Sequence, residues 1–174
     1  NVDFQVWQRV TSGTVNSYTC YRWYCWRNQQ ALTQQQAENG THNSGRFALR
    51  GNGTDVDNNS ANRNIAIGEQ AGKLINTGTH NVLIGSDAAC GITSGGYNIA
   101  FGNLSAKCLT TGTYNVLVGE RAGCLLAAGN FNVFMGRYAG RQVAGGSYNT
   151  FIGDESGLGQ TAGNCNVIIG HGSR

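Results

Sequence analysis

The chain alternates short apolar segments with polar, glycine-rich segments, and this pattern recurs along most of its length. NVLIG at residues 81–85 is followed by the near-copies NIAFG, NVLVG and NVFMG at residues 98–102, 115–119 and 132–136. In each copy three apolar residues stand between an asparagine and a glycine. Such a run, bounded by turn residues, predicts a β-strand of about four residues. A helix of ordinary length does not fit among so many glycines.

The repeat has a period of 17 residues, with neither an insertion nor a deletion. An asparagine opens every copy: Asn64, Asn81, Asn98, Asn115, Asn132, Asn149 and Asn166. A shift of one residue would reverse which strand side chains face inward, so a fixed period is typical of strands stacked in register. We therefore expect an all-β fold, a parallel β-solenoid (β-roll) of 17-residue coils that stack about 4.8 Å apart.

Both faces of the predicted strand are apolar. One face carries the first and third apolar positions, such as Val82 and Ile84, and the other carries the middle position. A solitary solenoid would expose one of these faces to water, so we expect one face inside the coil and the other against neighbouring chains. A closed homotrimer buries the same patch on every subunit; a dimer, or a single coil covered by the N-terminal segment, remains open. The interface candidates are the middle positions Ala66, Leu83, Ala100, Leu117, Phe134, Phe151 and Ile168.

Further registers predict packing inside and along the stack. The asparagines are expected to form a ladder of side-chain amides, each bonded to the next coil. Ile75, Ile92, Leu109, Leu126 and Val143 form a second apolar column. An aromatic column stands just before the asparagines: Tyr97, Tyr114, Phe131 and Tyr148, with His80 and Cys165 at its ends. A structural role is favoured over a ligand site for these columns. Charges of both signs predict a solvated edge at Glu69, Asp87, Glu120, Arg121, Arg137, Asp154 and Glu155.

Composition supports a stacked sheet and excludes some partners. The chain has 27 glycines and no proline, which fits coils with glycine corners whose strands need every backbone donor. A net charge of +3, dispersed along the chain, argues against nucleic acid as a partner. No apolar run approaches the roughly 20 residues of a membrane-spanning helix, so no membrane insertion is expected. The start at Asn1 and the end within a repeat are typical of a processed or excised piece.

The first part of the chain has a different composition. All three tryptophans lie within residues 7–26, and we assign residues 1–46 to an aromatic-rich N-terminal β cap or partial jelly roll. Residues 47–63 are expected to form a degenerate first coil and linker, with Gly51 in register with Gly68, and residues 64–174 the solenoid shaft. Two interpretations of the aromatic cluster remain open: carbohydrate contact through stacked rings, or a capping core over the end of the sheet. The contact candidates are Trp7, Tyr21, Arg22, Trp23 and Trp26.

Catalytic and metal-binding patterns are weak. The three histidines are scattered without a serine or cysteine partner in register, and acidic residues never share a constant register, so no catalytic residues are assigned. GNGTDVDNN at residues 51–59 lacks the glycine and final glutamate of an EF-hand loop, and no metal or cofactor is expected. Cys90, Cys108 and Cys124 lie on neighbouring coils, where a disulfide and small buried thiols both remain open.

The sequence of the repeat resembles the repeats of known fibre proteins. NVLIGSDAACGITSGGYN and NVLVGERAGCLLAAGNFN are similar to the N-x-A-[IV]-G repeats of bacteriophage tail-fibre shafts, which belong with the β-roll heads of trimeric autotransporter adhesins. The resemblance covers residues 64–174. It implies a rigid, trimeric, extracellular fibre, on a virion or a cell surface, that presents a host-attachment surface to a carbohydrate or protein receptor. Many such fibres continue into an intramolecular chaperone that is cut away.

The first residues resemble the opening of a phage jelly-roll module, F-x-x-W-Q-R-G-T followed by Y-x-x-D-R-W. The matching positions are Phe4, Trp7, Gln8, Arg9, Tyr18, Arg22 and Trp23. Val10 replaces the glycine and Tyr21 replaces the aspartate, so a shortened or rebuilt cap is expected.

The functional prediction is therefore a non-enzymatic structural fibre protein. Two alternatives are kept: a self-assembling extracellular filament subunit, and an ice-binding solenoid. The second needs a flat threonine ladder, for which the best column reads Asn76, Thr93, Thr110, Ala127, Ala144 and Thr161.

Overall fold

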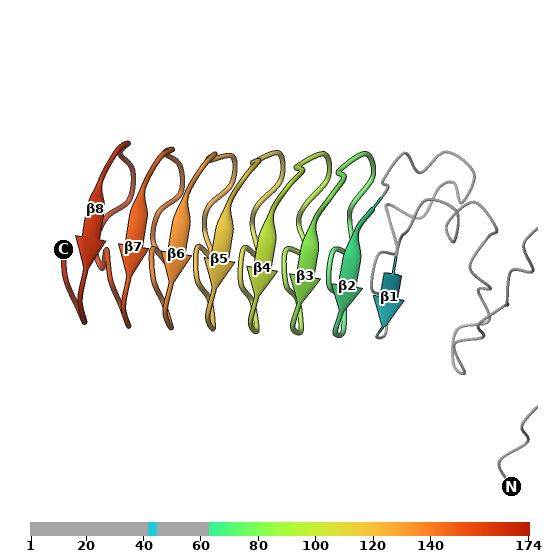
Figure 1. The fold of residues 1–174 in the computed structure, drawn as a ribbon, viewed down its shortest axis with the longest axis horizontal. Coiled ribbons are helices and arrows are strands. Elements are labelled where there is room, and N and C mark those ends of the chain that lie inside the picture. Colours follow the sequence, from blue (N-terminus) through green and yellow to red (C-terminus); the bar gives the residue numbers. More distant parts are fainter. Residues whose placement is uncertain (1–41, 45–62) are drawn as a thin grey trace, which may run out of the picture.

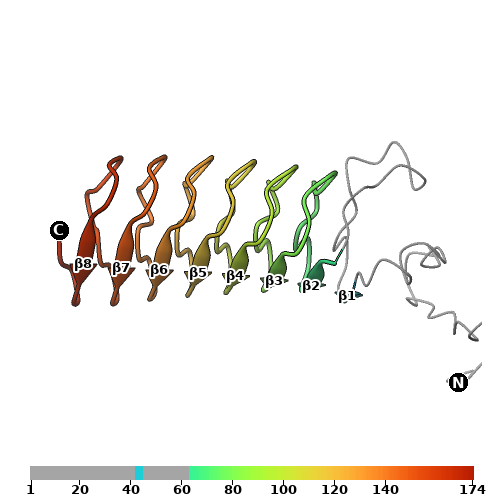
Figure 2. The same cartoon turned by 45° about the horizontal axis from the view of Figure 1, so that its top comes forward.

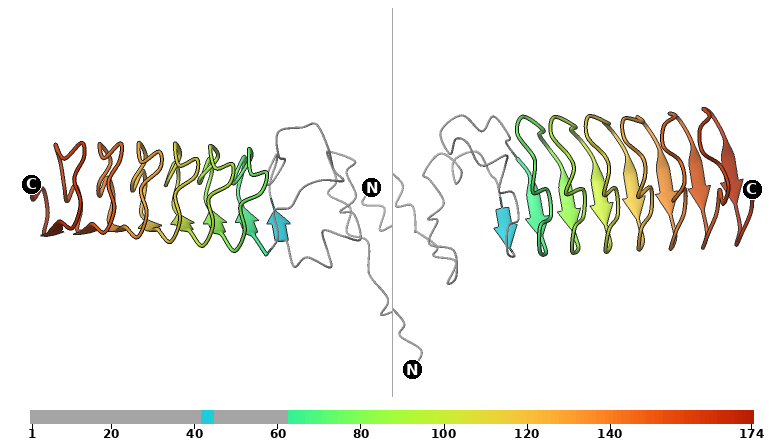
Figure 3. Two further views of the ribbon diagram at one scale, coloured as in Figure 1. Left: turned by 90° about the horizontal axis from the view of Figure 1, so that it is seen from above. Right: turned by 180° about the vertical axis from the view of Figure 1, so that it is seen from behind.

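The structure is a computed structural model that describes residues 42–44 and 63–174, and this part of the chain is a parallel β-solenoid (Figure 1). The described residues contain no helix. Eight three-residue strands form one sheet in chain order: β1 (His42–Ser44), β2 (Ile65–Ile67), β3 (Val82–Ile84), β4 (Ile99–Phe101), β5 (Val116–Val118), β6 (Val133–Met135), β7 (Thr150–Ile152) and β8 (Val167–Ile169). Each coil contributes one strand, and the strands lie along one edge of the stack (Figures 2 and 3).

The strand register confirms the 17-residue period from β2 onward. Ile65 pairs with Val82, Val82 with Ile99, and the same step continues to β8. The strand before β2 departs from it, because His42 of β1 pairs with Ile65. The strand that pairs with β2 therefore lies further upstream than one period. Gly51, which the sequence analysis places in register with Gly68, lies outside the described residues. Residues 1–41 and 45–62 lie outside the described residues, and with them the expected cap and the five carbohydrate-contact candidates.

The middle residue of each strand points into the coil, which corrects the predicted interface. Side chains alternate along a strand, and here the middle ones meet the second apolar column, Ile75 to Val143, in one continuous core. The two apolar faces look alike in sequence, so the pattern did not show which of them lines the coil. The predicted interface residues are therefore interior residues. At most 1% of the surface is exposed in each of Ala66, Leu83, Ala100, Leu117, Phe134 and Phe151, and Ile168 is partly buried against the same core.

In the coils of β6 and β7, a large strand side chain is matched by a glycine six residues later. Phe134 and Phe151 lie opposite Gly140 and Gly157, where a Cβ atom would stand 2.6 Å and 2.5 Å from a ring carbon. Where the strand residue is only Ala100, the matching position is Ala106. A close-packed interior of fixed width therefore couples these two positions, since a larger residue at one requires a smaller one at the other.

The asparagines form the expected ladder through the buried interior. In the central coil, Asn98 donates from its backbone N–H and from Nδ2 to Oδ1 of Asn81, at 2.9 Å and 3.0 Å. Its Nδ2 also donates across the coil to the carbonyl oxygen of Gly112 at 2.8 Å. The same bonds recur at Asn81, Asn115, Asn132 and Asn149. Each side-chain amide thus forms hydrogen bonds to the asparagines of the neighbouring coils and also joins the two sides of its own coil.

The glycine after each strand has a steric cause. Gly119 has φ of 132°, and a Cβ atom there would overlap the carbonyl oxygen of Gly136 in the next coil. Only glycine has both the backbone conformation and the clearance that this turn demands. The recurring strand–glycine pattern is therefore a corner of the solenoid.

Replacing a central asparagine should destabilise the stack strongly. Asn98→Ala removes the acceptor of the Asn115 backbone N–H and the donor to the Gly112 carbonyl, so we expect a loss of about 3 kcal/mol in the free energy of unfolding. The control Asn103→Ala removes only an exposed 3.4 Å bond to the Ser86 carbonyl and should cost less than about 0.5 kcal/mol. Urea unfolding followed by circular dichroism measures both. Equal losses would contradict the ladder.

The size coupling inside the coil predicts a non-additive double variant. Gly140→Ala places a methyl group against the Phe134 ring and should cost about 2–3 kcal/mol, from overpacking and the left-handed backbone. In a Phe134→Leu background the coil resembles the one that holds Leu83 with Ala89. We expect the double variant to be at least ~1 kcal/mol more stable than the sum of the single losses. Additive losses, measured by the same urea titration, would refute the coupling.

Candidate functional site

The first and third residues of β2 to β8 form an exposed apolar strip, hereafter the strand face. The first positions are Ile65, Val82, Ile99, Val116, Val133, Thr150 and Val167, and the third are Ile67, Ile84, Phe101, Val118, Met135, Ile152 and Ile169. Eight of these side chains are exposed by 36% to 72%. The sequence showed that both faces of the strand were apolar, and among residues 63–174 no other segment covers this one.

The aromatic column is confirmed as a continuous stack. The rings of His80, Tyr97, Tyr114, Phe131 and Tyr148 follow one another with centroids 4.5 to 5.1 Å apart and planes within 8° of parallel. Each inner ring therefore has both faces against neighbours, and mainly ring edges face the solvent. A sugar that stacks on an aromatic face finds no free face on the inner rings of the column, so the structural role remains the better interpretation.

These aromatic residues have a left-handed backbone, which sequence analysis did not predict. Tyr97, Tyr114, Phe131 and Tyr148 have φ between 55° and 61°, a region that bulky residues rarely occupy. The turn directs the following asparagine into the coil. Ring stacking and the asparagine bonds offset the cost of this conformation.

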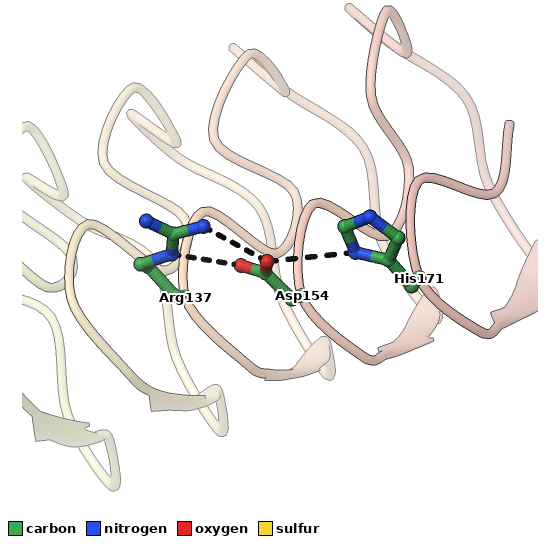
Figure 4. Close-up of polar contacts among 3 residues, drawn as sticks. All are labelled: Arg137, Asp154 and His171. Atoms are coloured by element: carbon green, nitrogen blue, oxygen red, sulfur yellow. Dashed lines mark hydrogen bonds and ion pairs between the residues drawn. The ribbon is translucent and has the colours of Figure 1, made fainter.

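The charged edge contains one ion-pair series across three coils (Figure 4). Arg137 donates to both carboxylate oxygens of Asp154, from Nε at 3.0 Å and from an Nη at 2.9 Å, and Nδ1 of His171 lies 3.5 Å from the same carboxylate. The hydrogen bond from Arg137 holds the pKa of Asp154 below its usual value and raises that of Arg137. Because the groups are solvent-exposed, the pair contributes little to stability. All seven charged residues predicted for the solvated edge, from Glu69 in the first coil to Glu155 in a later one, are exposed or half-buried.

The three cysteines on neighbouring coils are free thiols. Burial raises the pKa of Cys90, with the Asp87 carboxylate adding to the effect, and burial likewise raises the pKa of Cys124. Both thiols are therefore protonated, and poorly nucleophilic, at neutral pH.

The threonine ladder expected for an ice-binding surface is interrupted by alanines, and two of its hydroxyl groups already donate hydrogen bonds to backbone carbonyls of the chain. Oγ1 of Thr93 donates to the Thr110 carbonyl at 3.2 Å, and Oγ1 of Thr110 donates to the Ala127 carbonyl at 2.9 Å. The next two positions are alanines. The column thus offers few free hydroxyl donors to an ordered water layer.

Among residues 63–174 and the short strand β1, no group of three histidine, cysteine or acidic side chains is placed to hold a metal ion. His80 belongs to the aromatic stack and His171 to the charged edge, so the structure does not bring them together. The segment 51–59 lies outside the described residues. No helix in the described part is long and apolar enough to cross a membrane.

The sequence matches no protein-family model, and no similar curated protein or solved structure was found.

Proposed function

We propose that this chain is a non-enzymatic structural fibre protein, of the tail-fibre or adhesin type, in which three copies form a rigid shaft. The observation that carries the proposal is the strand face. Its two columns expose on the order of 1,000 Å2 of apolar surface, against roughly 300–600 Å2 for the largest patch of a typical monomer. A standard protein interface needs about 800 Å2 per partner, so the strand face alone is large enough for stable association.

The strand face also has the right shape for association between copies. It is formed by a parallel sheet, a type of sheet that is almost always covered on both sides, and its side chains repeat at the same register in every coil. Copies aligned in parallel can therefore bring the same residues together along the whole stack. Because the strand face is only two columns of side chains wide, three such faces can meet around one axis without leaving part of any of them exposed to water. A closed assembly of this kind ends the association at three copies.

The internal bonding supports a load-bearing role. The amide ladder and the aromatic stack run through successive coils without a break from Asn64 to Asn166 and from His80 to Tyr148. Bending the stack would stretch bonds in several coils together. An extracellular site, on a virion or cell surface, and a role in attachment to a host receptor follow from the resemblance of the repeat to fibre shafts, and are part of the proposal.

Light scattering on the purified chain tests the assembly. We expect a mass of three chains for the wild type and a folded monomer for Phe101→Lys or Met135→Lys, because these side chains lie on the strand face with 51% and 42% exposure. Leu125→Lys is the matched control: Leu125 is 47% exposed but lies off the strand face, so the trimer should persist. Circular dichroism checks that each variant remains folded.

Leu117→Lys should behave differently from these variants. It buries a charge inside the coil, which should unfold the stack rather than dissociate it. A well-folded wild-type monomer would refute the shaft proposal, and end-to-end polymers in electron micrographs would favour the filament alternative.

A further inference from the structure

Three cations on three successive coils, Lys107, Arg121 and Arg141, lie near enough to the Cys124 thiol for their charges to act on it. Lys107, Cys124 and Arg141 occupy the same position of adjacent coils, and Arg121 begins the turn that contains Cys124. Backbone bonds hold this arrangement: Cys124 N–H donates to the Arg121 carbonyl at 3.2 Å, and Leu125 N–H donates to the Arg141 carbonyl at 3.3 Å. The cluster is therefore fixed by the solenoid itself.

These cations lack the acceptors that such groups normally have. The Nε atom of Arg121 is buried and has no hydrogen-bond partner. The Arg141 guanidinium lies 5.1 Å from the centre of the Tyr138 ring, and within the described residues neither it nor Lys107 forms an ion pair. Arg137, by contrast, is held by both oxygens of Asp154. The cluster thus has unused donors, and a buried donor without a partner is costly.

The local field is positive around the thiol. Besides burial, the charges that act on the pKa of Cys124 are those of Cys108, which raises it, and of Lys107, Arg121 and Arg141, which lower it. Because the thiol stays protonated at neutral pH, it does not neutralise the cations. The surface beside Cys124, between Lys107, Arg121 and Arg141, therefore attracts an anion.

We propose that Lys107, Arg121 and Arg141 form a binding site for a carboxylate or sulfate group carried on a polysaccharide chain. The proposal rests on the attachment role proposed above and gives that role a site on the shaft. An oxygen anion beside Cys124 would accept from the terminal guanidinium nitrogens of Arg121 and Arg141 and from Nζ of Lys107, in the charge-assisted geometry that arginine favours.

A sparsely charged polymer suits the surroundings better than a nucleic acid. Glu120 adjoins Arg121, and Asp154 and Glu155 lie on the coil after Arg141, so carboxylates border the cluster. Duplex DNA carries a charge about every 1.7 Å and would be repelled on either side. A polysaccharide with one anionic group per sugar or per disaccharide places its charge at the cluster and uncharged rings beside the carboxylates.

Binding of the full chain to immobilised chondroitin sulfate oligosaccharide, which carries one anionic group per sugar, tests the site, with neutral dextran as a blank. We expect Lys107→Gln, Arg121→Gln and Arg141→Gln each to weaken binding about tenfold, as loss of one charge-assisted bond does. Arg121→Lys keeps the charge but removes the paired terminal donors of the guanidinium, and should weaken binding as well. The control Arg137→Gln removes an exposed cation that already has a partner, and should change affinity by less than about twofold.

Several results would overturn the site. Equal weakening by Arg137→Gln would show diffuse attraction, and competition by inorganic sulfate at matched anion concentration would show a site for free anions only. Equally tight binding of a DNA duplex, lost in the same variants, would replace the polysaccharide with nucleic acid. Light scattering on the same samples separates the two proposals: a trimer that does not bind chondroitin sulfate overturns only this site, and a monomer that binds it overturns only the shaft.

Discussion

The asparagine amide ladder is the interaction on which the rest of this structure depends. Each side chain is buried, yet its oxygen accepts two bonds from the next asparagine and its nitrogen closes the coil on a glycine carbonyl. A buried amide in an apolar interior is costly unless all of these bonds form. The ladder is satisfied only when every coil has the same length. This requirement explains why the 17-residue period has no insertion or deletion.

Other features follow from the position of the amides. The residue before each asparagine adopts a left-handed conformation that turns the amide inward, and this places an aromatic ring outside at the same height in successive coils. The coil closed by the amide has a fixed width, so the strand residue and the residue six positions later share a limited volume, as Phe134 and Gly140 do. The middle strand residue is committed to this interior. The two flanking residues are then left on the outside.

Much of this architecture was predictable from the sequence, because a repeat reports the same environment several times. The strands, the period, the amide ladder and the aromatic column all follow from residues that recur at one register. The orientation of the strand was not predictable, since Leu83 and its neighbours Val82 and Ile84 are equally apolar. Binary patterning separates two faces only when one of them is polar. The Lys107, Arg121 and Arg141 cluster was missed for another reason: Arg121 lies outside the register that Lys107 and Arg141 share, and only the folded coil shows that its Nε lacks an acceptor.

The solenoid thus separates two surfaces that the proposed fibre would use. The strand face is apolar and would meet copies of the same chain in the proposed shaft, whereas charged side chains lie on the turns that follow the strands. Both surfaces exist only if the amide ladder holds the coils in register. Hydrogen exchange at the backbone amides of Asn81, Asn98, Asn115, Asn132 and Asn149 tests this most directly, because each donates to the side-chain oxygen of the preceding asparagine. These amides should exchange as slowly as those of the strands they precede. Exchange as fast as that of the exposed turns would contradict the account.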